Sequence, residues 1–358
     1  MVVNTLKIQN FMMIEDAEFH WSPNINIICG ENSTGKTTLL KLLYSMVQPI
    51  GKHGFEFDRK DEIERRFVSK MLGVFRPDDQ KLGRLVSRRQ GSNRADFSAE
   101  FEQVGSLAIG FGNRQENHAD INMDFSNWYK LQKKRFNTIY IPTKEMISTT
   151  EHFASLYEEY ELDFEEMYYD LTKLLSRPLS KGPNTNEQKK ILKSFEEIMQ
   201  GEIIQKNKKF YLKVQGQGEF EMGLVSDGYR KLSMIIYLIL SGSLNKESIL
   251  FWDEPETNMN PKMIRPIVKS IVELAKMGVQ VFVTTHDYFV LQEFNMLTAY
   301  PELNEEHLDL RFYSLYKEEN GSLCSEVQAS ASDLTHNAIM EEFDALYDRE
   351  QEVIYGSK

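Results

Sequence analysis

The feature that most restricts the fold of this chain is the segment GENSTGKT at residues 30–37, which fits the pattern Gly-x4-Gly-Lys-[Ser/Thr]. The apolar run NINIIC (24–29) before it is typical of a buried strand, and KTTLLKLLYSMV (36–47) after it has apolar residues at helical spacing. A strand, a glycine-containing loop and a helix in this order predict a phosphate-binding loop in an α/β fold. The plain alternative is a glycine-rich turn, and the flanking strand and helix argue against it.

The residues of this loop predict how it binds a nucleotide. Gly30 and Gly35 let backbone N–H groups surround phosphates, and the start of the helix adds a favourable dipole. Lys36 can neutralise the β and γ phosphates, and the Thr37 hydroxyl can ligate Mg²⁺. We therefore predict ATP and Mg²⁺ as ligands, and the nucleotide-binding residues are Gly30, Asn32, Gly35, Lys36, Thr37 and Thr38.

Two later apolar strands end in residues suited to phosphoryl transfer. ILFWDEPE (249–256) ends with Asp253, placed to hold Mg²⁺, and Glu254, placed to orient or deprotonate the attacking water. VQVFVTTHD (279–287) follows one strand–helix–strand unit later, and its His286 can donate to a γ-phosphate. Such residues alone are more often a solvated strand end and a structural histidine, but the phosphate loop favours function. We predict Asp253 as a metal ligand beside Thr37, and Glu254 and His286 as catalytic.

The stretch SDGYRK (226–231) precedes a second buried helix, LSMIIYLIL. Ser226, Gly228 and the first backbone N–H groups of this helix would form another anion-binding end. A chain that already has one phosphate loop can use a second such end if it closes over the nucleotide of another copy. The sequence therefore favours a homodimer in which this helix end contacts the nucleotide of the partner copy.

The order of these motifs resembles the ATP-binding-cassette ATPase fold. LKIQNF (6–11), the phosphate loop, ETNMNPKM (256–263) and IPTKEMIS (141–148) resemble the SMC-like, Old-type branch of ATPases. That branch includes ATPase subunits of phage-defence systems such as Septu and the abortive-infection ATPases. The resemblance implies that two subunits sandwich two ATP molecules, with Ser226 and Gly228 acting in trans on the γ-phosphate.

The chain departs from the family pattern at several positions. The residue after Asn10-Phe11, often basic in relatives, is Met12, and the signature reads Ser-Asp-Gly-Tyr-Arg. A clear Gln in the loop after the central strand is missing, and Glu145 is the nearest polar candidate.

The expected fold is α/β, an ABC-ATPase-like P-loop NTPase with an N-terminal antiparallel β subdomain and an inserted helical lobe. We divide the chain into an N-terminal half of the core (1–145), an acidic, aromatic helical lobe (146–202) and a C-terminal half of the core (203–358). Short strand-like pieces, including GRLVSRR (83–89), lie between 83 and 125, and a closing hairpin turns at Asn320-Gly321.

Composition limits the location and the partners. There are 54 acidic and 42 basic residues, and the net charge of −12 disfavours a general nucleic-acid coat. The cysteines, Cys29 and Cys324, form no disulfide framework, and the longest apolar run (232–240) is too short to span a bilayer. The first residues lack a secretion-signal pattern. We expect a cytoplasmic protein without a membrane partner.

Two basic runs leave a nucleic-acid partner open. KLGRLVSRRQGSNR (81–94) and KLQKKR (130–135) interrupt an acidic chain, and the alternatives are solvated faces or a docking surface for an acidic protein. A transporter ATPase is disfavoured because Lys36 and Ser226 are far apart in the sequence. Asp309 and Asp333 look like surface carboxylates, so a nuclease or toxin is expected to be a separate chain. No long heptad array indicates a coiled-coil arm.

These observations favour a dimerising ATPase that senses or regulates a partner effector, a nuclease or toxin encoded nearby, in anti-phage defence. The alternative is a DNA-bound, SMC-like ATPase in repair or chromosome maintenance.

Overall fold

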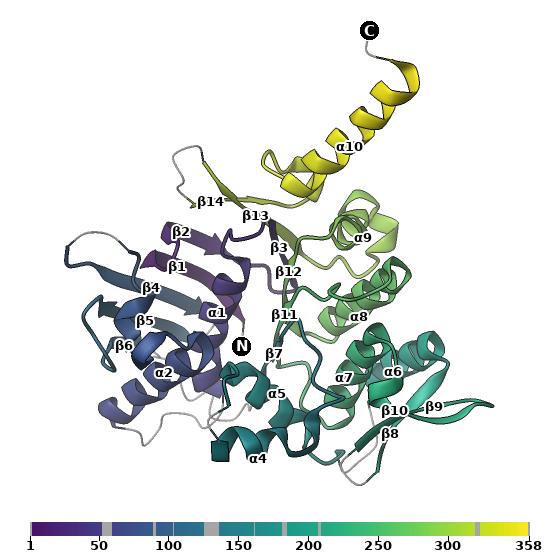
Figure 1. The fold of residues 1–358 in the computed structure, drawn as a ribbon, viewed down its shortest axis with the longest axis horizontal. Helices are drawn as coiled ribbons and strands as arrows, with labels where there is room; N and C mark the ends of the chain where they lie inside the picture. The colour runs from purple at the N-terminus through teal and green to yellow at the C-terminus, as the bar shows by residue number, and fades with distance from the viewer. Residues whose placement is uncertain are drawn as a thin grey trace.

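The computed structural model describes residues 2–51, 59–88, 91–102, 104–124, 136–160, 162–180, 185–206, 209–318 and 323–356. Its centre is a six-stranded sheet with the order β14-β13-β3-β12-β11-β7 (Figure 1). The strands are β3 (Ile25–Gly30), β7 (Thr138–Ile141), β11 (Ile249–Asp253), β12 (Gln280–Thr285), β13 (Leu310–Lys317) and β14 (Leu323–Gln328). All neighbours are parallel except the β13–β14 pair, so the carboxyl ends of the parallel strands meet at one edge.

Helices cover both faces of this sheet, and strands β3, β11 and β12 are buried along their whole length. Ile28, Phe251 and Phe282 pack with α1 (Lys36–Gly51) on one face. Ile27, Trp252 and Val283 face the opposite core. That core contains α7 (Asp227–Leu240), α8 (Ile264–Lys276) and α9 (Tyr288–Ala299). The phosphate-loop helix and the signature helix therefore lie on opposite faces of the sheet.

An antiparallel sheet covers α1 from the other side, as predicted for the N-terminal subdomain. Its order is β2-β1-β4-β5-β6, and it shares one hydrophobic core with α1 and α2 (Lys60–Phe75). The strands are β1 (Val3–Phe11), β2 (Ile14–His20), β4 (Arg94–Phe101), β5 (Gly105–Gly112) and β6 (Asp120–Asp124).

One strand expected in this region is absent from the described residues. Leu82–Leu85 form a 3-10 helix where GRLVSRR was expected to be extended. Leu82 and Leu85 are both buried and lie three residues apart, a spacing that suits a tight helical turn and not a strand. The correction leaves the subdomain assignment intact.

The described residues of the segment between the two halves of the core form three helices and a small sheet. The helices are α4 (Thr150–Tyr160), α5 (Glu166–Leu175) and α6 (Asn186–Met199), and α5 packs against β7 while α6 packs against α7 and α8. Strands β8 (Gly201–Lys206), β9 (Lys209–Val214) and β10 (Gly218–Glu221) form an antiparallel sheet that we had not predicted. The proposed domain boundaries stay a prediction.

The last described elements are the β13–β14 hairpin and helix α10 (Ala338–Tyr355). The predicted hairpin is present, and its turn at residues 320–321 lies outside the described residues. Helix α10 begins beside α9 and projects away from the body of the molecule (Figure 1). Among the described helices, none combines the length and the apolar character needed to cross a bilayer.

Candidate nucleotide-binding and active site

Three neighbouring parallel strands bring the predicted site residues to one edge of the central sheet. Strand β3 ends at Gly30, β11 ends at Asp253, and β12 ends immediately before His286. Because β12 lies between β3 and β11, the phosphate loop, the two carboxylates and the histidine meet at the carboxyl ends of these strands. This edge is where open α/β sheets bind their ligands.

The backbone of the phosphate loop requires glycine at the two predicted positions. Gly30 has φ +145°, and a Cβ there would lie 2.2 Å from the Leu315 carbonyl oxygen. Gly35 has φ +87°, and Ser33 also lies in the left-handed region with φ 64°. Asn32 is exposed in the loop, and Thr38 is half-buried in the first turn of α1. The loop therefore leads directly to a helix N-terminus, the arrangement that binds phosphate.

The Lys36 side chain folds back over this loop. Its ammonium group donates to the carbonyl oxygens of Gly30 and Glu31, each at 2.8 Å. Burial lowers the pKa of Lys36, and the carboxylate of Glu254 opposes that shift. A bound phosphate offers a negatively charged acceptor in place of the two carbonyl groups, so the lysine can exchange these partners without losing hydrogen bonds.

Thr37 and Asp253 supply two oxygen ligands side by side. The Thr37 hydroxyl lies 3.0 Å from Asp253 Oδ1, which also accepts from Thr284 at 2.6 Å. The Tyr140 hydroxyl donates to the other carboxylate oxygen at 3.1 Å. Burial raises the pKa of Asp253, and the hydrogen bonds from Thr284 and Thr37 oppose this. A hydroxyl beside a fixed carboxylate fits Mg²⁺, which binds oxygen donors through one or two carboxylates and substrate phosphates.

Glu254 and His286 contact each other directly. His286 Nδ1 lies 2.9 Å from Glu254 Oε1, and the backbone of Glu254 is left-handed, with φ 45°. Two bonds to Thr284 hold this unusual backbone, since Glu254 N–H donates to the Thr284 carbonyl at 3.2 Å and to its hydroxyl at 3.1 Å. A non-glycine residue kept in this conformation is a strained feature of the kind that concentrates at functional sites.

Glu256 is a residue that sequence reasoning missed. Its side chain is buried, and Oε1 accepts from the Thr285 hydroxyl at 2.7 Å and from the His286 backbone N–H at 3.2 Å. Its Oε2 has no hydrogen-bond partner among the described residues. Burial raises the pKa of Glu256. The Glu256 carboxylate therefore positions the backbone of His286. The sequence signal for Glu256 was its place two residues after Glu254 in the run Asp-Glu-Pro-Glu.

Ser226 and Gly228 lie at the start of α7, as predicted. Ser226 is the N-cap residue but makes no side-chain cap hydrogen bond, and its side chain is exposed. Gly228 is buried, and a Cβ there would lie 3.1 Å from Met263. Within the described ranges, no hydrogen bond or ion pair joins Ser226 to the phosphate loop of the same chain. The helix tip is therefore available to another molecule.

Helix α7 contacts the loop that follows β11 through the buried side chain of Lys231. Lys231 is almost completely buried, and its ammonium group donates to the carbonyl oxygens of Pro255 and Thr257, each at 2.9 Å. Arg230 pairs with Glu145 at 3.0 Å. Burial lowers the pKa of Lys231 to about 8. Glu145 lies after β7, as expected, and contacts α7 through Arg230. Sequence reasoning missed Lys231, although a lysine at the start of an apolar helix was a visible signal.

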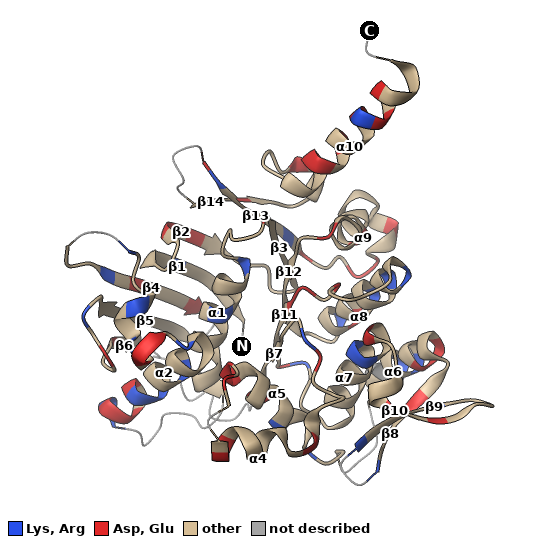
Figure 2. Cartoon of the chain, viewed as in Figure 1, with Lys and Arg blue, Asp and Glu red and all other residues tan. Residues whose placement is uncertain are grey.

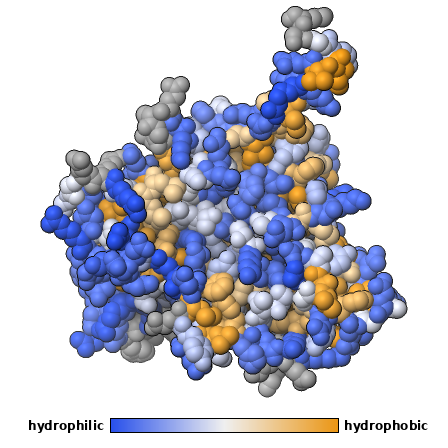
Figure 3. Space-filling model, viewed as in Figure 1, coloured by the Kyte–Doolittle hydropathy of each residue, from blue (hydrophilic) through white to orange (hydrophobic). Residues whose placement is uncertain are grey.

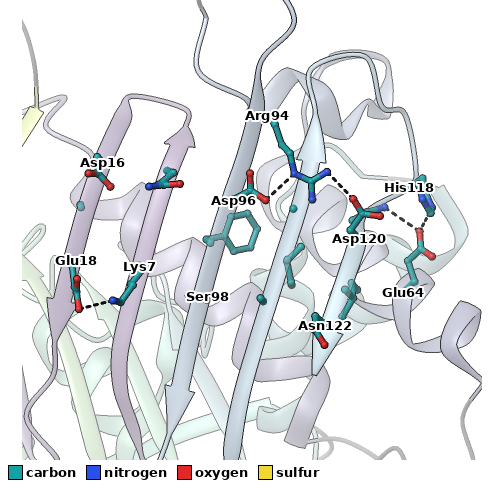
Figure 4. Close-up of a pocket in the computed structure, with 18 of the residues that line it drawn as sticks. Lys7, Asp16, Glu18, Glu64, Arg94, Asp96, Ser98, His118, Asp120 and Asn122 are labelled. Atoms are coloured by element: carbon teal, nitrogen blue, oxygen red, sulfur yellow. Dashed lines mark hydrogen bonds and ion pairs between the residues drawn. The ribbon is translucent and has the colours of Figure 1, made fainter. Parts of the chain in front are cut away.

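Three basic residues of the run at 81–94, Lys81, Arg84 and Arg94, pair with carboxylates. Arg94 donates to Asp96 at 2.8 Å and to Asp120 at 2.6 Å, on the outer face of the five-stranded sheet (Figure 4). The same hollow face carries the Lys7–Glu18 pair at 3.1 Å, and Figure 2 shows acidic and basic residues mixed along the strands of this sheet. Lys81 and Arg84 also pair with acids, Glu116 and Asp79. Arg89 and the run 130–135 lie outside the described residues.

Comparison with curated proteins gives short matches to DNA-repair proteins. The chain is 36% identical over 72 residues to the DNA replication and repair protein RecF of Protochlamydia amoebophila, which covers 20% of each protein. It is 48% identical over 44 residues to RecF of Chlamydia abortus, 12% of each. The matched stretches span a fifth or less of these relatives.

Solved structures show the same fold over nearly the whole chain. An SMC head bound to the C-terminal winged-helix domain of ScpA gives a TM-score of 0.57 at 11% identity, covering 93% of this chain and 99% of that one. An Smc head with an extended coiled coil, bound to the C-terminal domain of ScpA from Pyrococcus furiosus, gives 0.50 at 10% identity, covering 98% and 99%. The predicted α/β, ABC-ATPase-like fold is therefore confirmed.

A family model described as "AAA domain, putative AbiEii toxin, Type IV TA system" matches residues 25–292, which include every predicted site residue. The match covers most of the chain. The protein therefore belongs to this family of AAA-domain proteins, and its fold is that of a P-loop ATPase like the SMC heads.

Proposed function

We propose that this chain binds and hydrolyses ATP as a nucleotide-dependent homodimer and thereby controls a partner effector. The observation that carries the proposal is the meeting of Lys36, the Thr37–Asp253 pair and the Glu254–His286 pair at one sheet edge. These groups match what phosphoryl transfer needs, namely phosphate neutralisation, a metal-ligating oxygen pair and a base beside a hydrogen-bond donor.

Each residue has a distinct role in the proposed reaction. Lys36 leaves the Gly30 and Glu31 carbonyl groups to bind the β and γ phosphates, while the backbone N–H groups of the loop hold their oxygens. Mg²⁺ held by Thr37 and Asp253 would neutralise charge on the phosphate oxygens. Glu254 orients and deprotonates the attacking water, and His286 positions Glu254 and donates to the γ-phosphate.

The proposed dimer rests on the free tip of α7. The exposed Ser226 and the first N–H groups of the helix form an anion-binding end that the phosphate loop of the same chain does not use. In the dimer, this end binds the γ-phosphate held by the partner copy. Lys231 then connects the bound helix to the loop that carries the copy's own Glu254.

The proposed setting is anti-phage defence, with a nuclease or toxin encoded nearby as the effector. The family description names a putative toxin of a type IV toxin–antitoxin system, which supports a setting of this general kind, and the separate effector remains part of the proposal. A DNA-bound ATPase in repair or chromosome maintenance is the second candidate, and the RecF and SMC-head similarities favour it. The carboxylate partners of Lys81, Arg84 and Arg94 weaken the case for phosphate contacts by these residues. The cytoplasmic location stays a prediction.

ATPase rates under three conditions, together with binding of the neighbouring product, separate the two candidates. The ATPase rate of the purified full chain is measured alone, with duplex DNA, and with the co-expressed product of the adjacent reading frame. If the chain regulates an effector, it should bind that product. Its ATPase rate should then be the same with and without DNA. DNA-stimulated turnover without any bound neighbour would instead support the repair function.

A further inference from the structure

Helix α10 carries an apolar stripe that the rest of the chain leaves mostly uncovered. Ile339 and Met340 at its start pack against the main core, and Phe343 stacks on Tyr288 with ring centroids 4.1 Å apart. Beyond this turn every residue from 341 to 350 is exposed. Leu346 is 57% exposed and Val353 is 86% exposed, and Figure 3 shows apolar surface on this projecting helix.

The stripe has the spacing of a helix that packs along another helix or in a groove. Its residues alternate steps of four and three positions, through Ile339, Phe343, Leu346, Glu350 and Val353. Tyr347 and Ile354 widen the same face, since each lies one turn from a member of the stripe. Helices in proteins gain most of their stability from packing such a face, which the outer turns of α10 lack within one copy.

Charge indicates what kind of molecule covers the stripe. The helix contains six carboxylates and one basic residue, Arg349, which already pairs with Glu342 at 2.8 Å. The ribbon of this helix carries more acidic than basic positions in Figure 2. Helices that lie on membranes carry Lys and Arg on their polar face, so a lipid surface does not fit.

Glu350 further separates a second copy from a different protein. It occupies a position within the stripe, between Leu346 and Val353. Pairing α10 with α10 of another copy would place two Glu350 carboxylates in one buried seam, where unpaired charges are strongly destabilising. A groove with a Lys or Arg opposite Glu350 would satisfy the same carboxylate.

We propose that α10 is the docking element for a separate protein, which offers an apolar groove edged by Lys and Arg. The inference rests on the proposed function for the partner's identity, the effector, and adds the surface that binds it. It places that surface on the C-terminal helix, apart from the phosphate loop and from the α7 tip.

The test uses the full chain and the co-expressed product of the adjacent reading frame, with the dissociation constant measured by calorimetry. Leu346→Glu should weaken binding by about 30-fold, as expected for a buried interface side chain. The matched control Ala345→Glu adds the same charge on the opposite face and should bind like the wild type. Glu350→Lys should weaken binding by about tenfold or more through like-charge contact, and Glu352→Lys should not.

The outcomes separate this inference from the proposed function. If the wild type binds and Leu346→Glu binds equally well, the docking role of α10 is wrong while the effector function stands. If the wild type does not bind the neighbouring product, the effector function fails and the inference fails with it. A nucleotide-free dimer that Leu346→Glu alone converts to a monomer would show that a second copy covers the stripe. Unchanged ATPase rates in all four variants confirm that the core is folded.

Discussion

His286 Nδ1 lies 2.9 Å from Glu254 Oε1, and this contact joins the ends of β12 and β11 at the proposed point of water attack. Neither side chain is fully buried, so both remain accessible to water and to a bound nucleotide. The backbone N–H of His286 donates to the buried carboxylate of Glu256. In the proposed reaction, Glu254 is therefore the base, His286 orients it, and the buried carboxylate of Glu256 positions His286.

Replacing the histidine should slow hydrolysis without releasing the nucleotide. His286→Asn should lower kcat by about 100-fold, because a positioned acid–base partner contributes about this much, while the KM for ATP changes little. Steady-state ATPase assays give both constants. The matched control is His20→Asn on β2, which lies outside the site and should keep full activity. A raised KM with unchanged kcat would show that His286 only binds substrate.

Removing the loop lysine should weaken nucleotide binding itself. Lys36→Ala deletes the ammonium group that would exchange two carbonyl partners for phosphate oxygens, so ATP affinity should fall by about tenfold or more. Isothermal calorimetry with the purified chain measures this loss. Lys7→Ala, on the outer face of the five-stranded sheet, is the control with the same change of charge. An unchanged affinity would remove Lys36 from the nucleotide site.

The buried Lys231 should make stability depend on pH in the alkaline range. Burial lowers its pKa from 10.5 to about 8, so between these values the unfolded chain binds a proton that the folded chain does not. Its contribution to the free energy of unfolding is therefore present above pH 10.5 and is lost as pH falls through about 8.

Lys231→Met tests this dependence together with the role of the lysine in the site. The stability advantage of the wild type over the variant should grow from pH 8 toward pH 10, measured by urea unfolding. A constant difference would contradict the buried position of the ammonium group. The variant should also lower kcat more than ATP affinity, because the carbonyl groups of Pro255 and Thr257, next to Glu254, lose their donor.

A buried ionic cluster should contribute to the stability of the whole domain. Lys70 on α2 donates to Asp170 at 2.7 Å and also pairs with Glu166, which joins α2 to α5. Lys70→Met leaves these carboxylates without their cation and should lower the free energy of unfolding by about 3 kcal/mol. Lys173→Met, at a half-exposed position on α5, should cost about 0.5 kcal/mol or less. Equal losses in chemical denaturation would show that the cluster contributes little.

The motifs that could be predicted from sequence are those in which one short segment determines its own geometry. The loop from Gly30 to Thr37 needs glycine at Gly30 and Gly35, where φ is positive. Strands β11 and β12 are largely apolar because they are buried along their length, and a polar residue at the end of such a run is easy to recognise. Each of these features is local, so the positions of the phosphate loop, Asp253, Glu254 and His286 at strand ends could be predicted, while the roles of these residues remain predictions.

The residues that were missed act through contacts between distant segments. Lys231 reaches carbonyl groups more than twenty positions away, and Glu256 receives hydrogen bonds from the next strand of the sheet. Arg94 looked basic in the sequence, but Asp120 neutralises it only after β4, β5 and β6 pair. Tertiary pairing of this kind has no local pattern. The small β8–β10 sheet is different, because its strands pair with their neighbours in the sequence and the glycine-containing turn at 215–217 was an available local signal.

The central claim is that the α7 tip of one copy completes the ATP site of another. Glu254→Gln removes the base but keeps nucleotide binding, so light scattering in ATP and Mg²⁺ should give twice the 41.8 kDa monomer mass. Adding Ser226→Arg should return this variant to a monomer, whereas Ser69→Arg on the exposed side of α2 should not. The same mass for Glu254→Gln with and without ATP would contradict the shared site.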